Sequence, residues 1–186
     1  MPNEDNPQTE RLRLRRWRPD DRAPFADLNA DPEVMRHFPA IMSRAESDAL
    51  VDRIEAHFAE HGYGLWAVEV IGSREFIGFV GLAYVPFEAH FTPALEVGWR
   101  LARSAWGHGY ATEAARAALT FGFDHSDVPE IVSITAVSNV RSQAVMQRLG
   151  LTRRPEDDFE HPRLEPGHPL RPHVLYRMKR GDWPAP

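Results

Sequence analysis

Hydrophobic positions along the chain follow two periods, one typical of strands and one typical of helices. Residues 11–17 alternate arginine and leucine, which predicts a strand with one buried face. Apolar residues recur at every fourth position in residues 50–58, after a capping box that begins at Ser43, and Gly62 can end that helix. A shorter helix is expected after Asp20. The chain therefore opens with a strand and two helices.

The rest of the chain alternates strand and helix patterns. Further strands are predicted at residues 65–70, 76–84, 94–101, 131–137 and 173–178, and further helices at 110–123 and 139–148. The first two of these strands are five residues apart and are expected to form a hairpin. The proline-rich residues 155–170 are expected to be irregular. This order is neither a dinucleotide-binding repeat nor a barrel.

Length and composition indicate one folded domain. The chain has 186 residues, 42% hydrophobic and 26% charged, which suits a single globular domain over residues 9–180. The polar ends, residues 1–8 and 181–186, are expected to be flexible. No apolar run approaches the length of a membrane span, and the start lacks a secretory pattern. We therefore expect a cytoplasmic protein that does not bind membranes.

Charge and cysteine content exclude several classes of function. A net charge of -5 makes nucleic acid an unexpected partner, and the absence of cysteine excludes disulfides, thiolate catalysis and sulfur-ligated metals. The histidines His161, His168 and His173 lie near two aspartates, but their spacing matches no metal-ligand motif. We expect no metal site.

The most informative local pattern is a glycine loop between a strand and a helix. Residues 94–101 run into residues 104–109, which include Gly107 and Gly109, and an alanine-rich helix follows. Such a loop directs several backbone N–H groups and the positive end of the helix dipole at one point, which favours phosphate. An ordinary tight turn is the alternative. The loop matches neither a dinucleotide fingerprint nor a P-loop.

This loop carries a resemblance to a known family. Residues 106–114, Trp-Gly-His-Gly-Tyr-Ala-Thr-Glu-Ala, resemble the acetyl-CoA pyrophosphate loop of the GNAT N-acetyltransferases, most closely the ribosomal-protein-alanine acetyltransferase-like subgroup. Residues 95–101 are similar to the family's cofactor strand. Asn139-x-x-Ser142 and the Leu-Gly-Leu at residues 149–151 are similar to a further family segment.

The resemblance implies a fold and a cosubstrate. The fold would be an α/β (α+β) single domain with a mixed, mostly antiparallel sheet of about seven strands, helices on both faces and one splayed parallel strand pair. The cosubstrate would be acetyl-CoA, with the backbone of Leu101 and the side chain of Asn139 on the pantetheine arm and Ser142 beside it. The pyrophosphate would contact the backbone amides of Trp106, Gly107, His108, Gly109, Tyr110, Ala111 and Thr112.

Acetyl transfer to an amine needs a base and an acid. Glu96 lies in the middle of a predicted strand, where a carboxylate is unusual unless the face is a wet cleft, so it is a candidate base. A strand glutamate that is merely exposed or ion-paired is the alternative. Many family members have a tyrosine where this chain has Met146, so Ser142 is the candidate acid. Its alternative role is an ordinary first-turn hydroxyl of the helix.

The acceptor is the least defined partner. Phe38, Trp66, Tyr84 and Trp99 are candidates for the wall of an acceptor pocket, with core packing as the alternative for each. Residues 31–43 and 156–170 are expected to form the acceptor loops. The predicted activity is acetylation of a protein N-terminus or a small-molecule amine by a monomer or homodimer. The competing hypotheses are a non-catalytic acyl-CoA-binding or sensing domain and a nucleotide-binding protein.

Overall fold

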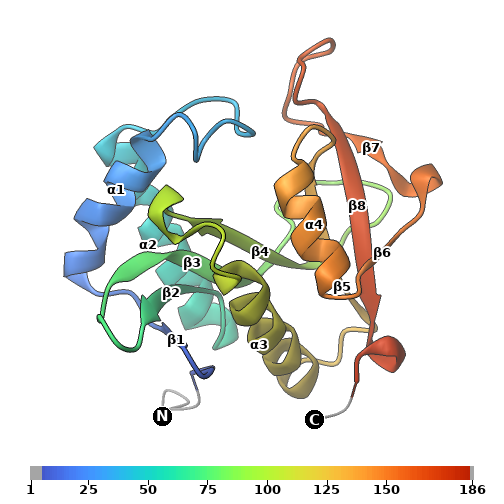
Figure 1. Cartoon of the computed structure of the whole chain (residues 1–186). Coiled ribbons are helices and arrows are strands. Elements are labelled where there is room, and N and C mark those ends of the chain that lie inside the picture. The colour runs from blue at the N-terminus through green and yellow to red at the C-terminus, as the bar shows by residue number, and fades with distance from the viewer. Residues whose placement is uncertain (1–5, 185–186) are drawn as a thin grey trace.

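The computed structural model describes residues 6–184 of the chain, and its centre is one mixed β-sheet (Figure 1). The strands are β1 (Leu12–Arg15), β2 (Leu65–Val70), β3 (Phe76–Tyr84), β4 (Leu95–Leu101), β5 (Glu130–Ala136), β6 (Thr152–Arg153), β7 (Phe159–Glu160) and β8 (Pro172–Lys179). The helices are α1 (Arg22–Ala30), α2 (Arg44–His61), α3 (Tyr110–His125) and α4 (Val140–Arg148).

The strand order is β1-β2-β3-β4-β5-β8-β6, and β7 also pairs with β8. Every neighbouring pair is antiparallel except β4 and β5, which run parallel. That parallel pair is short, with only Leu95 opposite Ile131 and Glu96 opposite Val132. The predicted mixed sheet with one splayed parallel pair is therefore confirmed.

Helices cover both faces of the sheet. In Figure 1, α3 and α4 lie in front of the sheet and α2 lies behind it, with α1 packed beside α2. The helix α3 packs on β3 and β4 through fully buried alanines, Ala114, Ala115 and Ala118. Because alanine side chains are small, the helix axis can come close to the sheet. This packing fixes the start of α3 at the end of β4.

The capping predictions are confirmed for α2. The Ser43 side chain accepts a hydrogen bond from the Glu46 amide, the Glu46 carboxylate accepts one from the Ser43 amide, and Gly62 ends the helix with a φ of 78°. The first helix differs from its prediction. Residues Pro19–Asp21 form a separate 3-10 turn, so α1 begins at Arg22.

The C-terminal region holds more regular structure than the sequence predicts. Residues 155–170, expected to be irregular, contain the 3-10 turn Pro155–Asp157 and strand β7. With β6, this gives eight strands instead of about seven. Both β6 and β7 have two residues, too few to show an alternating pattern, and both form only because β8 offers them an edge.

The ends of the described chain are attached to the fold. The Leu14 amide donates to the Pro7 carbonyl at 2.9 Å, and Gln8 forms a bridge with Arg13. At the other end, the Trp183 ring lies 6.1 Å from that of Phe123. These contacts join residues Pro7, Gln8 and Trp183 to the fold, and the rest of the ends predicted to be flexible, residues 1–5 and 185–186, lie outside the described part. Across residues 6–184, no helix is long and apolar enough to cross a membrane.

Candidate active site

The parallel strands β4 and β5 diverge directly after their two paired residues. Beyond Glu96, the Val97 carbonyl accepts a hydrogen bond from the Ser133 hydroxyl at 2.9 Å, so a side chain takes the place of a backbone partner. Neither the rest of β4 nor the rest of β5 pairs with the other strand. Backbone groups along such an edge require hydrogen-bond partners, and a peptide-like ligand can supply them by strand addition.

The glycine loop follows the open end of β4. The indole Nε1 of Trp106 donates to the Leu101 carbonyl at 3.0 Å and folds the chain back after a 3-10 turn. The Leu101 carbonyl therefore already has a partner, although the family resemblance implied that the Leu101 backbone would contact the pantetheine arm. Gly107 and Gly109 both have a φ of 80°, a conformation that side-chain-bearing residues rarely adopt.

Helix α3 starts without a side-chain cap. Its N-cap residue is Gly109, which has no side chain to accept a hydrogen bond from the first amides. Only the fourth amide, that of Glu113, bonds back to the Gly109 carbonyl. The amides of Tyr110, Ala111 and Thr112 are thus available together at the positive end of a helix of 16 residues. This arrangement fits a phosphate group.

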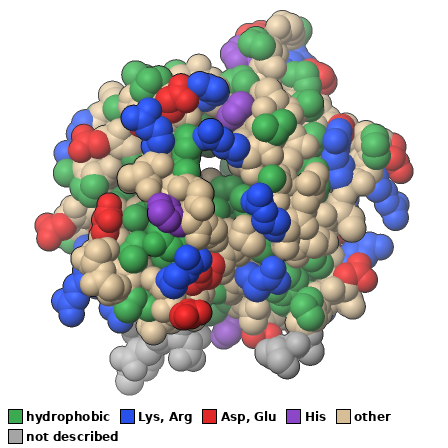
Figure 2. Space-filling view, viewed as in Figure 1, with side chains coloured by type: hydrophobic (Ala, Val, Ile, Leu, Met, Phe, Trp, Pro, Cys, Tyr) green, Lys and Arg blue, Asp and Glu red, His purple; other side chains and the backbone are tan. Residues whose placement is uncertain are grey.

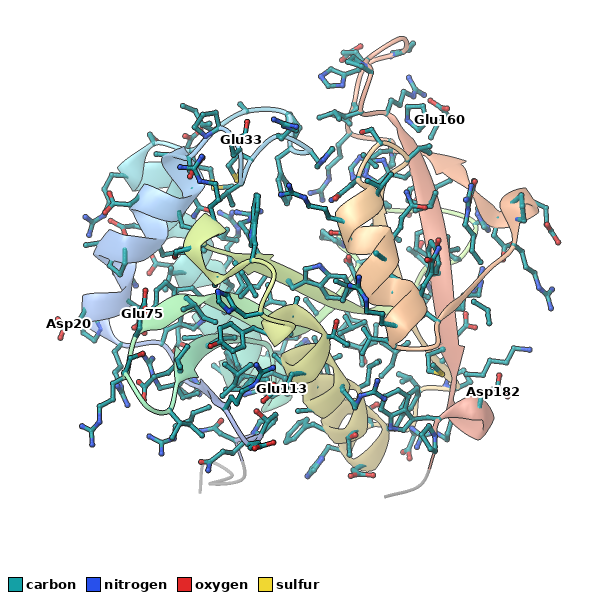
Figure 3. The ribbon with its side chains drawn as sticks, in the orientation of Figure 1. Asp20, Glu33, Glu75, Glu113, Glu160 and Asp182 are labelled. Carbon is teal, nitrogen blue, oxygen red and sulfur yellow. The ribbon has the colours of Figure 1, made fainter. Side chains whose placement is uncertain are left out.

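Glu113 ties this helix start to the beginning of β1. Its carboxylate accepts hydrogen bonds from the Thr9 hydroxyl at 2.5 Å, the Arg11 amide at 3.1 Å and the Arg11 Nε at 2.7 Å. Figure 3 shows Glu113 near the first turn of α3, on the side of the N-terminal chain. The Arg11 guanidinium also lies 4.9 Å from the Tyr110 ring centre. Glu113 is therefore a structural anchor for the loop.

Glu96 lies where the two strands separate. Burial raises the pKa of the Glu96 carboxyl group to about 8, and the nearby Ile134 backbone of β5 opposes this shift in part. A Cβ placed on Gly98 would lie 3.9 Å from the Glu96 Oε1, so the absent side chain leaves space beside the carboxylate. Glu96 is not exposed, and none of the ion pairs within residues 6–184 includes it, so the structure does not favour the alternative of an exposed or ion-paired glutamate. Its raised pKa suits a group that exchanges a proton near neutral pH.

Ser142 reaches the same gap from α4. Its hydroxyl oxygen accepts hydrogen bonds from the Trp99 Nε1 at 3.3 Å and from the Asn139 Nδ2 at 3.1 Å. The Asn139 amide also caps α4 and donates to Thr135, so its polar atoms have partners within the protein. With its lone pairs occupied, the Ser142 hydroxyl is left to donate its own proton. Met146, at the position of the family tyrosine, is buried in the core.

The four acceptor candidates do not gather in one place. Trp66 is only 1% exposed and packs against Phe58 and Phe121, so it belongs to the core. Tyr84 is 39% exposed at the end of β3, near the histidines of α2. Trp99 lies on the face of β4 that is turned toward α4, where its indole contacts Ser142. Phe38 lies on the other face of β4, over Arg100.

Phe38 leads to a residue that sequence reasoning missed. Its ring lies 4.2 Å from the guanidinium carbon of Arg100, a buried residue of β4. The available signal was a charged residue in a strand whose neighbours are mostly apolar. A second unexpected contact joins the same loop to the turn after β5, where the His37 Nδ1 and the Ser138 hydroxyl are 3.2 Å apart.

The surface is hollowed above this region. Figure 2 shows one deep hollow near the middle of the drawn face, with basic side chains at its rim. The two loops expected to contact the acceptor reach the upper part of the molecule from opposite sides. Figure 3 labels Glu33 on the first of these loops and Glu160, in strand β7, within the second.

The histidines of the C-terminal segment form an aromatic cluster. The His161 and His173 rings are 4.8 Å apart and both lie near Phe159. Burial, together with the charges of His173 and Arg163, lowers the pKa of His161 to about 4. Within residues 6–184, no three histidine, aspartate or glutamate side chains are grouped closely enough to hold a metal ion.

The divergent strands, the uncapped helix start and the side chains of Glu96 and Ser142 all lie around the end of the β4–β5 pairing. The family model of the acetyltransferase (GNAT) domain matches residues 11–152, and the chain belongs to this family of acetyltransferases. It is 31% identical to the uncharacterized protein YkkB of Bacillus subtilis over 144 residues, 77% of this chain and 83% of that one. It is 30% identical to the FsC-acetyl coenzyme A-N(2)-transacetylase of Aspergillus fumigatus, over 84% of this chain and 68% of that one.

Solved structures share the fold. The acetyltransferase from Agrobacterium tumefaciens superposes with a TM-score of 0.74 at 27% identity, over 92% of each chain. RimL, a ribosomal L7/L12 alpha-N-protein acetyltransferase in complex with coenzyme A, gives 0.74 at 18%, over 96% of this chain and 99% of that one. The spermidine N-acetyltransferase from Vibrio cholerae, in complex with CoA and spermine, gives 0.73 at 18%, over 94% and 99%.

Proposed function

We propose that this protein transfers the acetyl group of acetyl-CoA to a primary amine, either a protein N-terminus or a small molecule. The observation that carries the proposal is the separation of β4 and β5 beside the uncapped start of α3. Acetyl-CoA supplies an activated thioester, a peptide-like arm and a diphosphate. The open strand edges suit the arm, and the amides of residues 110–112 suit the diphosphate.

The binding residues act through their backbones. Gly107 and Gly109 allow the main chain to turn toward the diphosphate, and the amides of residues 106–112 supply the donors. Along β4, the free backbone groups of Trp99 and the Leu101 amide are the candidates for contact with the pantetheine arm, because the Leu101 carbonyl is bound by Trp106. Asn139 would hold α4 and Ser142 in position.

Two side chains would move protons. Glu96, once ionised, would accept a proton from the acceptor ammonium, directly or through one water. The Ser142 hydroxyl would donate toward the leaving sulfur, oriented by Trp99 and Asn139. Both groups lie at the gap between β4 and β5, on β4 and α4 respectively. This pairing favours catalysis over a non-catalytic acyl-CoA-binding or sensing domain, since simple binding needs neither group.

The similar proteins support a class of acceptor, primary amines, and no particular molecule. RimL is described as acting on a protein N-terminus and the Vibrio enzyme as acting on spermidine, so both acceptor types remain in the proposal. A relation to the ribosomal-protein-alanine subgroup is part of the same hypothesis. We also propose a single catalytic domain over residues 9–180, a cytoplasmic location and a monomer or homodimer, with neither nucleic acid nor membrane as partner.

The test is a transfer assay on an amine panel. Purified protein, acetyl-CoA and amines, including N-terminal peptides and polyamines, should release free CoA and yield acetylated product by mass spectrometry. The Glu96→Gln variant is the control for catalysis, and it should still bind acetyl-CoA in calorimetry. Binding without transfer to any amine would favour the sensing domain. Displacement of acetyl-CoA by ATP or NAD would favour a nucleotide-binding protein.

A further inference from the structure

Arg100 is a buried cation without an anionic partner. Its side chain lies in β4 and is 9% exposed. Its Nη1 donates to the Asn29 Oδ1 at 2.7 Å and lies 3.9 Å from the Met42 sulfur, while its buried Nε has no hydrogen-bond partner. Within residues 6–184, no carboxylate lies within ion-pair distance of it. A buried charge of this kind is unfavourable unless something else compensates it.

The other buried arginine of the sheet shows how the chain satisfies such a group. Arg15, 6% exposed, donates to both oxygens of Asp21 at 2.7 and 2.8 Å and to Glu69 at 2.7 Å. There, two carboxylates neutralise one guanidinium. Arg100 has instead one amide oxygen, one sulfur and two aromatic rings, those of Phe38 and Phe79. A structural role alone does not explain the missing anion.

Arg100 shares a face of β4 with the proposed base. Side chains alternate along a strand, so Glu96, Gly98 and Arg100 project from the same side. Four residues of strand separate the Cα atoms of Glu96 and Arg100 by roughly 13 Å. Gly98 lies between them and has no side chain to fill the space over this face of the strand. The two ionisable groups therefore stand at the two ends of one stretch of strand that carries no side chain on this face.

The aromatic ring that lies over Arg100 belongs to one of the loops expected to contact the acceptor. Phe38, from residues 31–43, lies over the guanidinium and is itself 36% exposed. One face of the ring thus meets Arg100 while much of the ring remains open to solvent. A ligand that enters beside Phe38 reaches the guanidinium without disturbing the apolar core.

We propose that Arg100 binds a carboxylate of the acceptor, so that the preferred substrates are amines that also carry a carboxylate. This inference rests on the proposed function and narrows its acceptor class. The amine would lie near Glu96 and the carboxylate would take the unpaired donors of the guanidinium, which match a carboxylate in shape. Burial lowers the pKa of Arg100 only to about 10, so the group stays charged at neutral pH.

The test uses matched pairs of acceptors that differ only in the carboxylate. The probes are β-alanine and 6-aminohexanoate, each beside its carboxamide, with kcat/KM measured for acetyl transfer. We expect the carboxylate to exceed the amide by about 10- to 100-fold for at least one chain length, the usual value of a hydrogen bond to a charged group. Equal values for acid and amide at both lengths would overturn the inference.

Variants separate recognition from folding. Arg100→Met should raise KM for the carboxylate to the level of the amide and leave KM for the amide unchanged, whereas Arg100→Lys should keep part of the preference. Arg22→Gln, which removes the same charge from a surface pair with Asp52, is the matched control and should change neither. Equal losses for acid and amide in both Arg100 variants would show a purely structural role and overturn the inference.

A binding measurement tests the carboxylate site at Arg100 separately from the acetyl-transfer activity. Titration of 6-aminohexanoate into the protein with CoA present should show saturable binding that Arg100→Met and Arg100→Lys weaken to different extents. If the probe binds in this way but no amine is acetylated, the proposed transfer fails and the carboxylate site stands. If amines are acetylated but the carboxylate neither binds nor improves turnover, the carboxylate site fails and the transfer stands.

Discussion

The Trp99 indole donates a hydrogen bond to the Ser142 hydroxyl at 3.3 Å, and this contact spans from strand β4 to helix α4. The two residues are 43 positions apart in the chain. The contact fixes the direction of the serine hydroxyl, because an oxygen that accepts from both Trp99 and Asn139 must point its proton elsewhere.

Ser142→Ala should lower kcat and leave acetyl-CoA affinity intact. The expected loss is about 10- to 100-fold, toward the lower range for general acid catalysis, because water can replace part of the donor and a thiolate leaves easily. Trp99→Phe, which removes the indole donor but keeps the hydroxyl, should show a smaller loss. Steady-state kinetics and calorimetry on both variants measure this. An unchanged kcat in Ser142→Ala would exclude the serine as the acid.

Glu96 should control the pH dependence of turnover. Since its pKa is raised to about 8, the carboxylate is mostly protonated at neutral pH, and kcat/KM should rise with pH and level off above about 8. Glu96→Gln should lack this rise and lose about 10²- to 10⁴-fold in kcat at pH 8. A pH–rate profile of both proteins, with an acceptor amine of low pKa, is the measurement. Parallel profiles would contradict the role of Glu96.

The same group should also affect stability. Its pKa in the folded protein lies above the value near 4.5 of an exposed glutamate, so the folded state holds more protons between these two pH values. Glu96 therefore makes the protein less stable as pH rises from about 4.5 to 8. In Glu96→Gln this contribution disappears, so the free energy of unfolding of the variant should exceed that of the wild type by more at pH 9 than at pH 5. Urea denaturation at both pH values tests the sign.

Gly109→Val should abolish acetyl-CoA binding in a protein that still folds. The substitution forces a branched residue into a φ of 80° at the start of α3, and its Cβ would lie 3.6 Å from the Arg11 guanidinium. Gly62→Val is the matched control, because Gly62 has a φ of 78° at the far end of α2. The control should show similar backbone strain and normal affinity. Calorimetric binding in Gly109→Val equal to the control would disprove the phosphate-loop assignment.

The buried ion pairs of Arg15 should dominate the acid sensitivity of the fold. Burial acts against ionisation of Glu69, but the hydrogen bond from Arg15 and the charges of three arginines lower its pKa below the usual value. The contribution of ionised Glu69 to the free energy of unfolding is present at neutral pH and is lost as pH falls below about 4.5. Glu69→Gln should cost about 3–5 kcal/mol, the usual effect of breaking a buried pair.

Glu55→Gln is the control for the loss of stability expected in Glu69→Gln. Glu55 pairs with Arg16 at the surface, where both side chains are more than 30% exposed, so its loss should cost at most about 1 kcal/mol. Urea denaturation at pH 7 measures both variants. Equal effects would mean that Glu69 contributes no more than a surface pair.

Local patterns predicted those parts of the fold and of the candidate site that depend on neighbouring residues. The capping box at Ser43, the loop of Gly107 and Gly109 and the position of Glu96 in a strand each follow from a few consecutive positions. The family resemblance supplied the splayed strand pair, which the structure confirms.

The rest of the site depends on contacts between distant segments. Trp66 and Phe38 are both aromatic, yet only packing decides that the first is buried against Phe121 and the second covers Arg100. The absence of an anionic partner for Arg100 is likewise invisible in sequence, because the amide oxygen that accepts from it, that of Asn29, lies 71 positions away. Strands β6 and β7 escaped prediction for the same reason, since both depend on the edge of β8.

The brief pairing of β4 with β5 divides the sheet into two blocks, β1 to β4 on one side and β5, β8, β6 and β7 on the other. Within the sheet itself, two residue pairs and the Ser133 contact connect the two blocks. A ligand that bonds to both edges adds a third set of links across this seam. When such a ligand is bound, the two blocks of the sheet should therefore unfold more nearly as a single cooperative unit.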